Sequence, residues 1–159
     1  MMSVRITGLP LMPVWFALVT EGIQADGAPV AVGSYPHARR VGQWLLLSGI
    51  GPRSSSDNSI PGNRYAANGM LCGYDIEAQC HAVFANVKAV LAASDAALSD
   101  LVDVTVYLTD MASDFQIYNR IWAEYFPDPL TAPCRTTLGI SALPTPIAIE
   151  LKCTAILRS

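Results

Sequence analysis

The sequence predicts an α+β fold, in which a single sheet carries two helices on one face. Two long helical patterns lie between runs of extended sequence, and 159 residues are enough for one domain with a sizeable core. Only 14% of the residues are charged, whereas 52% are hydrophobic. Soluble domains usually carry about a quarter charged residues. We therefore expect the sheet face without helices to pack on another subunit.

The first strands of the predicted sheet lie before residue 50. A strand over 16–23 precedes a hairpin whose extended arms, 32–41 and 44–49, are joined by Gly42-Gln43. The second arm begins with the continuous apolar run Trp44-Leu45-Leu46-Leu47, which is typical of a strand buried on both faces.

Two amphipathic helices are predicted further along the chain. The stretch 52–73 is rich in Ser, Asn, Gly and Pro without periodicity, so we expect a long loop before the first helix. Asp75 then caps a helix that runs to about residue 93. The second helix spans about 113–126 and ends before Pro127. The apolar positions of the first helix are Ile76, Cys80, Val83, Phe84, Val87, Val90 and Leu91, with Glu77, Gln79, His81, Asn86 and Lys88 among the polar remainder. The apolar stripe of the second is Phe115, Tyr118, Ile121, Trp122 and Tyr125.

The remaining strands complete the sheet. Residues 101–108 alternate between apolar and polar side chains, as in a half-buried strand. The last thirty residues read as a short strand over 133–139, a turn with two prolines, and a longer apolar strand from about residue 146.

Composition excludes several function classes. A net charge of −3 and a pI near 5.2 argue against nucleic-acid binding. The four cysteines (Cys72, Cys80, Cys134, Cys153) show no C-x-x-C spacing, and there are two histidines. We expect no metal site, no disulfide framework, no membrane association, and reduced thiols in a cytoplasmic protein.

The N-terminal segment carries a weak resemblance to a signal peptide, because residues 1–19 are apolar with Arg5 near their start. Gly8, Pro10 and Pro13 interrupt the run, and it is too short to span a bilayer. We interpret residues 1–17 as an N-terminal extension and 18–159 as the domain.

Two charges stand out in the apolar C-terminal strands. Arg135 lies on the first strand and Glu150 on the second, and a charge inside an apolar strand is costly to bury unless it is paired or used. One basic and one acidic group suit a site that binds a carboxylate and transfers a proton. Alternatively, the two groups pair with each other or lie at an exposed strand end.

Five stretches, in order and spacing, resemble the Rid family of reactive-intermediate deaminases, also called YjgF/YER057c/UK114. They are Gly33-Ser34-Tyr35-Pro36, Leu47-Ser48-Gly49, residues 118–126, Pro133-Cys134-Arg135-Thr136-Thr137, and Ile147-Ala148-Ile149-Glu150. The resemblance covers about residues 19–157. Residues 33–40, 75–80 and 100–110 are most similar to the 2-aminomuconate deaminase branch.

The resemblance implies a chorismate-mutase-like fold and a homotrimer with active sites between neighbouring subunits. It implies that no metal or organic cofactor is required. By position, Arg135 resembles the family arginine that binds the substrate carboxylate, and Glu150 resembles the acid that positions water. Tyr35 would stabilise the polar intermediate. Ser48, Gly49 and Asn119 fall at positions that line the cleft.

The sequence departs from the family pattern at one site position. Thr137 lies where many relatives carry cysteine, and the resemblance implies that its backbone N–H is the substrate-binding group there; the departure leaves deaminase chemistry plausible but weakens any role assigned to a thiol. Cys134 has no paired histidine in the sequence, and we expect an inert buried thiol.

The resemblance implies hydrolysis of 2-aminomuconate to 4-oxalocrotonate and ammonia in aromatic-compound catabolism. That substrate is a dicarboxylate and needs a second anchor. The candidates are His37, Arg39, Arg40 and Arg53. Arg53, which opens the long loop, is preferred over Arg39 and Arg40. Two alternatives stay open: a general deaminase of small 2-imino acids such as 2-iminopropanoate, and a non-catalytic trimeric protein that binds carboxylate ligands.

Overall fold

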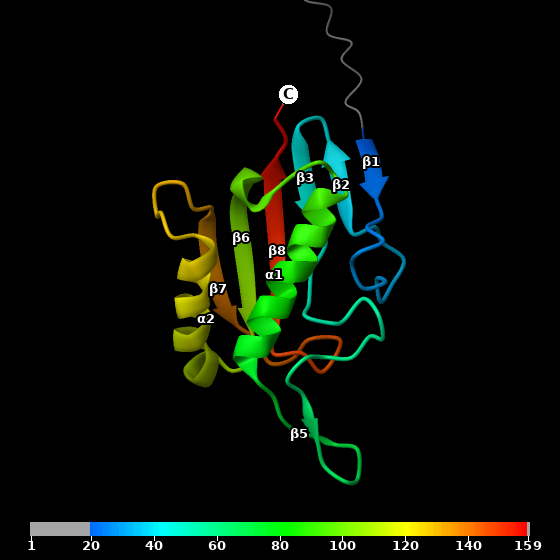
Figure 1. The fold of residues 1–159 in the computed structure, drawn as a ribbon, viewed down its shortest axis with the longest axis vertical. Coiled ribbons are helices and arrows are strands. Elements are labelled where there is room, and N and C mark those ends of the chain that lie inside the picture. The colour runs from blue at the N-terminus through cyan, green and yellow to red at the C-terminus, as the bar shows by residue number, and fades with distance from the viewer. Residues whose placement is uncertain (1–19, 159) are drawn as a thin grey trace, which may run out of the picture.

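A six-stranded sheet carries both long helices on one face, as Figure 1 shows, and this confirms the predicted α+β architecture. The computed structural model describes residues 20–158. The strand order is β1-β2-β3-β8-β6-β7, and all neighbours are antiparallel except β6 and β7. The strands are β1 (Thr20–Ile23), β2 (Ala38–Val41), β3 (Trp44–Leu47), β6 (Leu101–Leu108), β7 (Cys134–Gly139) and β8 (Ile149–Ile156).

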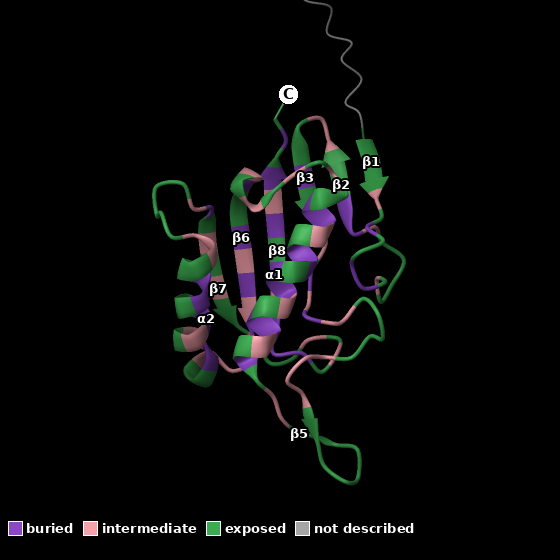
Figure 2. Ribbon diagram, viewed as in Figure 1, coloured by how far each residue is buried: buried purple, intermediate pink, exposed green. Residues whose placement is uncertain are grey.

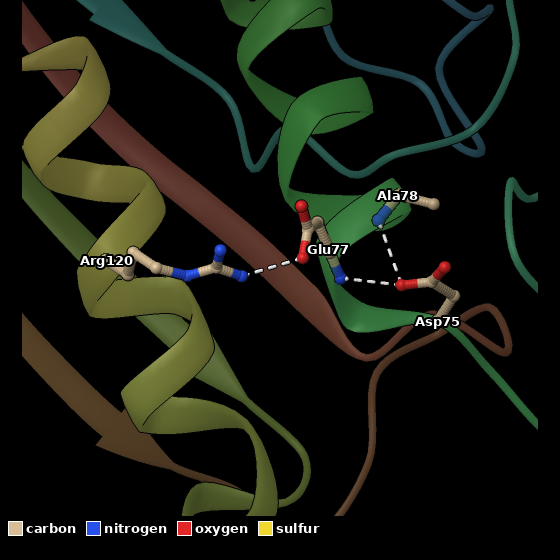
Figure 3. Close-up of polar contacts among 4 residues, drawn as sticks. All are labelled: Asp75, Glu77, Ala78 and Arg120. Atoms are coloured by element: carbon tan, nitrogen blue, oxygen red, sulfur yellow. Dashed lines mark hydrogen bonds and ion pairs between the residues drawn. The ribbon is translucent and has the colours of Figure 1, made fainter.

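Helix α1 (Ile76–Ala92) begins where the sequence predicts. The Asp75 carboxylate accepts hydrogen bonds from the backbone N–H groups of Glu77 (2.9 Å) and Ala78 (3.2 Å), which satisfies two of the helix's free donors (Figure 3). Glu77 also pairs with Arg120 of the second helix at 2.7 Å. Both partners of that pair are well exposed, so it contributes little stability.

Two residues of α1 that the sequence analysis grouped with the polar remainder, outside the apolar face, are buried. Gln79 is fully buried and Asn86 is 8% exposed. Both amides can be buried because their side chains bind backbone or side-chain groups of the loops that pack beside the helix.

Helix α2 (Met111–Tyr125) packs its aromatic stripe against α1 and the sheet. The Phe84 ring stacks on Tyr125 with centroids 4.1 Å apart, and Tyr118 is fully buried. Figure 2 shows the buried side of each helix turned toward the sheet. The stripe therefore belongs to the core, as predicted. Asp110 caps this helix by accepting from the N–H of Ser113.

The predicted long loop contains a short hairpin that its composition did not indicate. Strands β4 (Arg64–Tyr65) and β5 (Leu71–Gly73) pair there, and in Figure 1 the hairpin projects beyond the end of the sheet. A 3-10 turn over Leu98–Asp100 precedes β6.

The prediction that the run 44–47 is buried on both faces is wrong within one chain. Leu45 and Leu47 are fully buried, whereas Trp44 is 52% and Leu46 40% exposed. Successive strand residues point to opposite faces, and Leu45 and Leu47 belong to the core that the helices share with the sheet. Leu138 of β7 and Ile156 of β8 are also partly exposed. We call the face that carries Trp44, Leu46 and Ile156 the uncovered face.

The N-terminal prediction is only partly within the described residues. Strand β1 covers the end of the predicted strand 16–23, while residues 16–19 and the proposed extension 1–17 lie outside the described range. Across residues 20–158 the longest helices are too short or too polar to span a bilayer.

Candidate active site

The Arg135 side chain lies at the edge of the sheet, on the side of the helices. Its Nη2 donates to Asn119 Oδ1 at 2.9 Å, and the guanidinium carbon lies 4.9 Å from the Trp122 ring centroid and 5.5 Å from that of Tyr118. Its Nη1 is buried and has no hydrogen-bond partner among residues 20–158. The aromatic rings and Asn119 thus fix the guanidinium plane and leave donors available.

The Tyr118 hydroxyl is the second buried polar atom that lacks a partner within the described range. Burial raises the pKa of its phenol, although the Arg135 guanidinium acts in the opposite direction. The phenol therefore stays protonated, and its role beside Arg135 is that of an aromatic support.

Glu150 lies on the opposite face of the sheet from Arg135. In the β6 ladders Arg135 is level with Val104 and Glu150 is level with Tyr107. Laterally paired residues point to the same face, and residues an odd number apart on one strand point to opposite faces. Arg135 and Glu150 of one chain therefore do not form a common pocket, and the hypothesis that they pair within one chain is excluded.

The Glu150 carboxylate packs directly against the backbone of Gly49. A Cβ atom at position 49 would lie 2.3 Å from Oε1 and 2.8 Å from Cδ of Glu150. Gly49 follows β3, and the neighbouring bridge between Ile50 and Leu151 holds the two strand ends together. Burial raises the pKa of Glu150 above its ordinary value, because desolvation disfavours the charged form.

A cavity of about 150 Å³ opens beside Glu150. Its lining includes three other predicted site residues, Tyr35, Gly49 and Arg53, together with the turn at Pro144 and Thr145. A smaller cavity of about 40 Å³ shares Tyr35, Gly49 and Arg53 with it and reaches Ser48 and His37. The structure thus gathers most of the predicted residues around Glu150.

Ser48 and His37 hold the walls of this cavity together. The Ser48 hydroxyl donates to the Pro36 carbonyl at 2.6 Å. His37 is 9% exposed; its Nδ1 accepts from the N–H of Ala25 at 3.0 Å, and its Nε2 lies 2.9 Å from the Pro29 carbonyl. Both ring nitrogens are engaged by backbone groups, so the geometry gives His37 a structural role.

Thr137 and Cys134 both belong to β7, but they face different ways. Thr137 is level with Val106 and shares the helix side with Arg135. Cys134 is exposed, because it alternates with Arg135 and points away from the helices. The prediction that Cys134 is a buried thiol is therefore wrong.

Two residues from the polar remainder of α1 bind the segments next to the cavities. Gln79 donates from Nε2 to Asn63 Oδ1 and accepts the N–H of Ala148 at Oε1, both at 2.8 Å. Asn86 donates from Nδ2 to the carbonyls of Gly51 and Arg53, each at 2.8 Å. Gln79 and Asn86 are polar residues on the buried side of the helix. Apart from that polarity, nothing in the sequence indicated that they would be buried.

The described residues contain no group of three or more His, Cys, Asp or Glu side chains that could hold a metal ion. All four cysteines are free thiols. The residues around the larger cavity offer a carboxylate (Glu150), a phenol (Tyr35) and a guanidinium group (Arg53).

Residues 25–157 match the family model described as Endoribonuclease L-PSP. Among curated proteins, the chain is 34% identical over 137 residues to Reactive Intermediate Deaminase A, chloroplastic, of Arabidopsis thaliana, an alignment that covers 86% of this chain and 66% of that protein. It is 31% identical over 126 residues to the 2-iminobutanoate/2-iminopropanoate deaminase of Dermatophagoides farinae, covering 79% and 87% of the two chains.

Solved structures show the same architecture. The YjgF gene product of Escherichia coli superposes with a TM-score of 0.74 at 27% identity, covering 87% of this chain and 99% of that one. RidA from an Antarctic Psychrobacter superposes with a TM-score of 0.73 at 30% identity, covering 86% and 99%.

Proposed function

The chain belongs to the YjgF/RutC/Rid family, and we propose that it is a cofactor-independent deaminase that hydrolyses enamine or imine carboxylates. The observation that carries the proposal is Glu150. Its carboxylate is half-buried beside a cavity, it forms no ion pair within residues 20–158, and burial raises its pKa. A carboxylate of raised pKa is suited to accept and return a proton near neutral pH.

Arg135 supplies the carboxylate-binding function. A guanidinium binds a carboxylate through two parallel hydrogen bonds, and Arg135 keeps a buried Nη1 without a partner in the described part of the chain. An oxygen ligand at this nitrogen would satisfy a donor that is otherwise costly to bury. Asn119 orients the group from the other side.

We place the complete site between two subunits of a homotrimer. Arg135 and Glu150 face opposite sides of one sheet, so a substrate that contacts both needs an Arg135 and a Glu150 from different chains. The uncovered face, with Trp44 and Leu46 exposed, offers the apolar surface for this association. The family resemblance implies that the assembly has three subunits.

The proposed reaction proceeds in four steps. The enamine takes a proton at carbon and becomes an iminium ion; this proton is balanced by the one that the hydroxyl releases in the last step. Water adds to the C=N carbon while Glu150 accepts one of its protons. Glu150 then returns that proton to the nitrogen of the tetrahedral carbinolamine. The C–N bond breaks, ammonia leaves with the bonding electron pair, and the hydroxyl loses its proton to give the ketone.

The site residues divide these tasks. Arg135 holds the carboxylate adjacent to the reacting carbon, so the imine is fixed relative to Glu150. Tyr35, which lines the cavity, would stabilise the polar intermediate together with backbone N–H groups. Imines already hydrolyse in water, so positioning plus one acid–base group is sufficient assistance.

We propose 2-aminomuconate as the substrate, released as 4-oxalocrotonate and ammonia in aromatic-compound catabolism. Support comes from the branch resemblance and from the cationic Arg53 in the Glu150 cavity. The alternative is a small 2-imino acid, which is favoured by the activity for which the Dermatophagoides relative is named. A carboxylate-binding protein without turnover would not need Glu150. RNA cleavage, which the family description names, is not favoured by a net charge of −3.

Two further parts of the proposal concern the chain as a whole. The deaminase domain spans residues 18–159, preceded by the extension 1–17. A cytoplasmic location stays a prediction.

The test is ammonia release from freshly generated 2-aminomuconate and, in parallel, from 2-iminopropanoate, with wild type and Glu150→Gln. We expect the wild type to accelerate release and the variant to lose about 100-fold in kcat, the usual scale for one acid–base group. Wild-type protein that accelerates neither reaction would refute the enzymatic proposal. A rate unchanged in Glu150→Gln would refute the role of Glu150.

A further inference from the structure

We propose that Arg53 selects dicarboxylate over monocarboxylate ligands by binding the carboxylate distant from the reacting carbon, and that Asn86 positions Arg53 for this role. The inference specifies the substrate class of the site proposed above and rests on that function. The chemical class it predicts is a dicarboxylate.

The Arg53 guanidinium is fixed in place, but its charge is not neutralised. Nη2 donates to the Val30 carbonyl at 2.6 Å and Nη1 donates to Asn58 Oδ1 at 2.9 Å. Both acceptors are uncharged. Within residues 20–158 the ion pairs involve Arg120 and Arg158, not Arg53. A guanidinium held by neutral acceptors keeps its full charge for an anionic ligand.

Arg53 faces the same cavity as the proposed general base. It lines the 150 Å³ cavity with Glu150, Tyr35 and Gly49, and it also lines the adjoining 40 Å³ cavity. A cation and a proton-transfer carboxylate that line one cavity without pairing can contact two parts of one molecule. Arg135, on the other half of the site, holds the first carboxylate, so Arg53 is available for the second.

Asn86 fixes the backbone that carries Arg53. Its Nδ2 donates to the carbonyls of both Gly51 and Arg53 at 2.8 Å, and the Asn86 side chain is nearly fully buried on α1. Two hydrogen bonds from one helix side chain to a loop limit the movement of that loop. The second contact of the guanidinium, to Asn58, comes from a residue with φ of 60°, a conformation that asparagine tolerates better than most residues.

The binding test uses two stable six-carbon ligands that differ only at one end. Muconate (2,4-hexadienedioate) has a carboxylate where sorbate (2,4-hexadienoate) has a methyl group. Isothermal titration with wild type, Arg53→Gln, Arg53→Lys and Arg40→Gln gives the ratio of the two dissociation constants. Arg40 is the matched control, because it is an exposed arginine whose contact is to Gly42 of its own hairpin.

We expect wild type and Arg40→Gln to bind muconate about 10- to 100-fold more tightly than sorbate, the range for one charge-assisted pair. Arg53→Gln should bring the ratio near one without changing the affinity for sorbate, and Arg53→Lys should give an intermediate ratio. Asn86→Ala should reduce the ratio while its thermal unfolding remains cooperative. Equal binding of both ligands by wild type, or a ratio preserved in Arg53→Gln, would overturn the inference.

The binding readout separates this inference from the proposed function. Muconate preference without ammonia release from any imine would retain Arg53 as the selective residue and refute the deaminase. Release of ammonia by a protein that binds the two ligands equally would retain the deaminase and refute the role of Arg53.

Discussion

Replacing Gly49 with alanine should inactivate the site while leaving the fold intact. The backbone at Gly49 does not have a positive φ, so alanine is compatible with its conformation. The added Cβ would nevertheless lie 2.3 Å from Glu150 Oε1, whereas ordinary contacts begin at 3.4 Å. The obstructing atoms are the far end of a flexible side chain. The carboxylate must therefore move by about 1 Å, and the backbone need not.

The magnitudes follow from that displacement. A misplacement of about 1 Å of a catalytic group costs about 100-fold in rate, which corresponds to about 2.7 kcal/mol of barrier. The free energy of unfolding should change by less than about 1 kcal/mol, because alanine also restricts the unfolded chain. Ammonia release from 2-iminopropanoate gives the rate, and chemical denaturation gives the stability.

Gly27→Ala is the matched control. A Cβ at position 27 would lie 3.5 Å from the Ala89 methyl group, an ordinary contact away from Glu150. This variant should keep the wild-type rate. A Gly49→Ala protein that is folded and as active as wild type would refute the assignment of Glu150 as the proton-transfer group at this location. Equal losses in both variants would show that the effect is not specific to the site.

Four further predictions concern Glu150, the uncovered face and Arg135. Because burial raises the pKa of Glu150 above 4.5, kcat should fall as the pH is lowered through the raised value, and Glu150→Gln should remove this limb of the pH–rate profile. The raised pKa also means that the folded state disfavours the ionised form of Glu150. The stability gained by Glu150→Gln should therefore be absent below pH 4.5, grow as the pH rises through the folded pKa, and then level off. Denaturation at several pH values measures this gain, and a gain that is largest in acid would contradict the prediction. Leu46→Glu, which puts a charge on the uncovered face, should yield monomers by light scattering and abolish ammonia release, whereas an active monomer would exclude a site between subunits. Arg135→Lys should raise KM about 10- to 100-fold through loss of the bidentate geometry, and an unchanged KM would remove Arg135 from the substrate site.

Much of the fold could be predicted from periodicity alone. The three-and-four spacing of α1 and the alternation of β6 reflect burial of one face, and Asp75 marks the helix start because it supplies acceptors for free backbone donors. The run 44–47 could not be assigned correctly in the same way. Its four apolar residues are equally compatible with one buried face or two, and only the position of the helices showed which face one chain covers.

The candidate site, too, could be predicted from the sequence only in part. Arg135 and Glu150 could be selected from the sequence because charges are rare in apolar strands. The sequence also suggested Arg53 as an anchor, although nothing in it placed Arg53 beside Glu150. The burial of Gln79 and Asn86 was missed, because a polar residue on a helix is normally solvated unless a distant loop brings it a partner.

By itself, the sequence determined the succession of the six sheet strands and the two long helices, the acidic net charge and the identity of the two unusual charges. The tertiary structure decided that these charges lie on opposite faces of the sheet and that Glu150 packs on Gly49. It also decided that Asn86 of α1 donates a hydrogen bond to the loop that carries Arg53. Local periodicity depends on neighbours three or four residues apart. The register of β6 with β7 and β8, which sets the face of each charge, depends on contacts between segments distant in the chain.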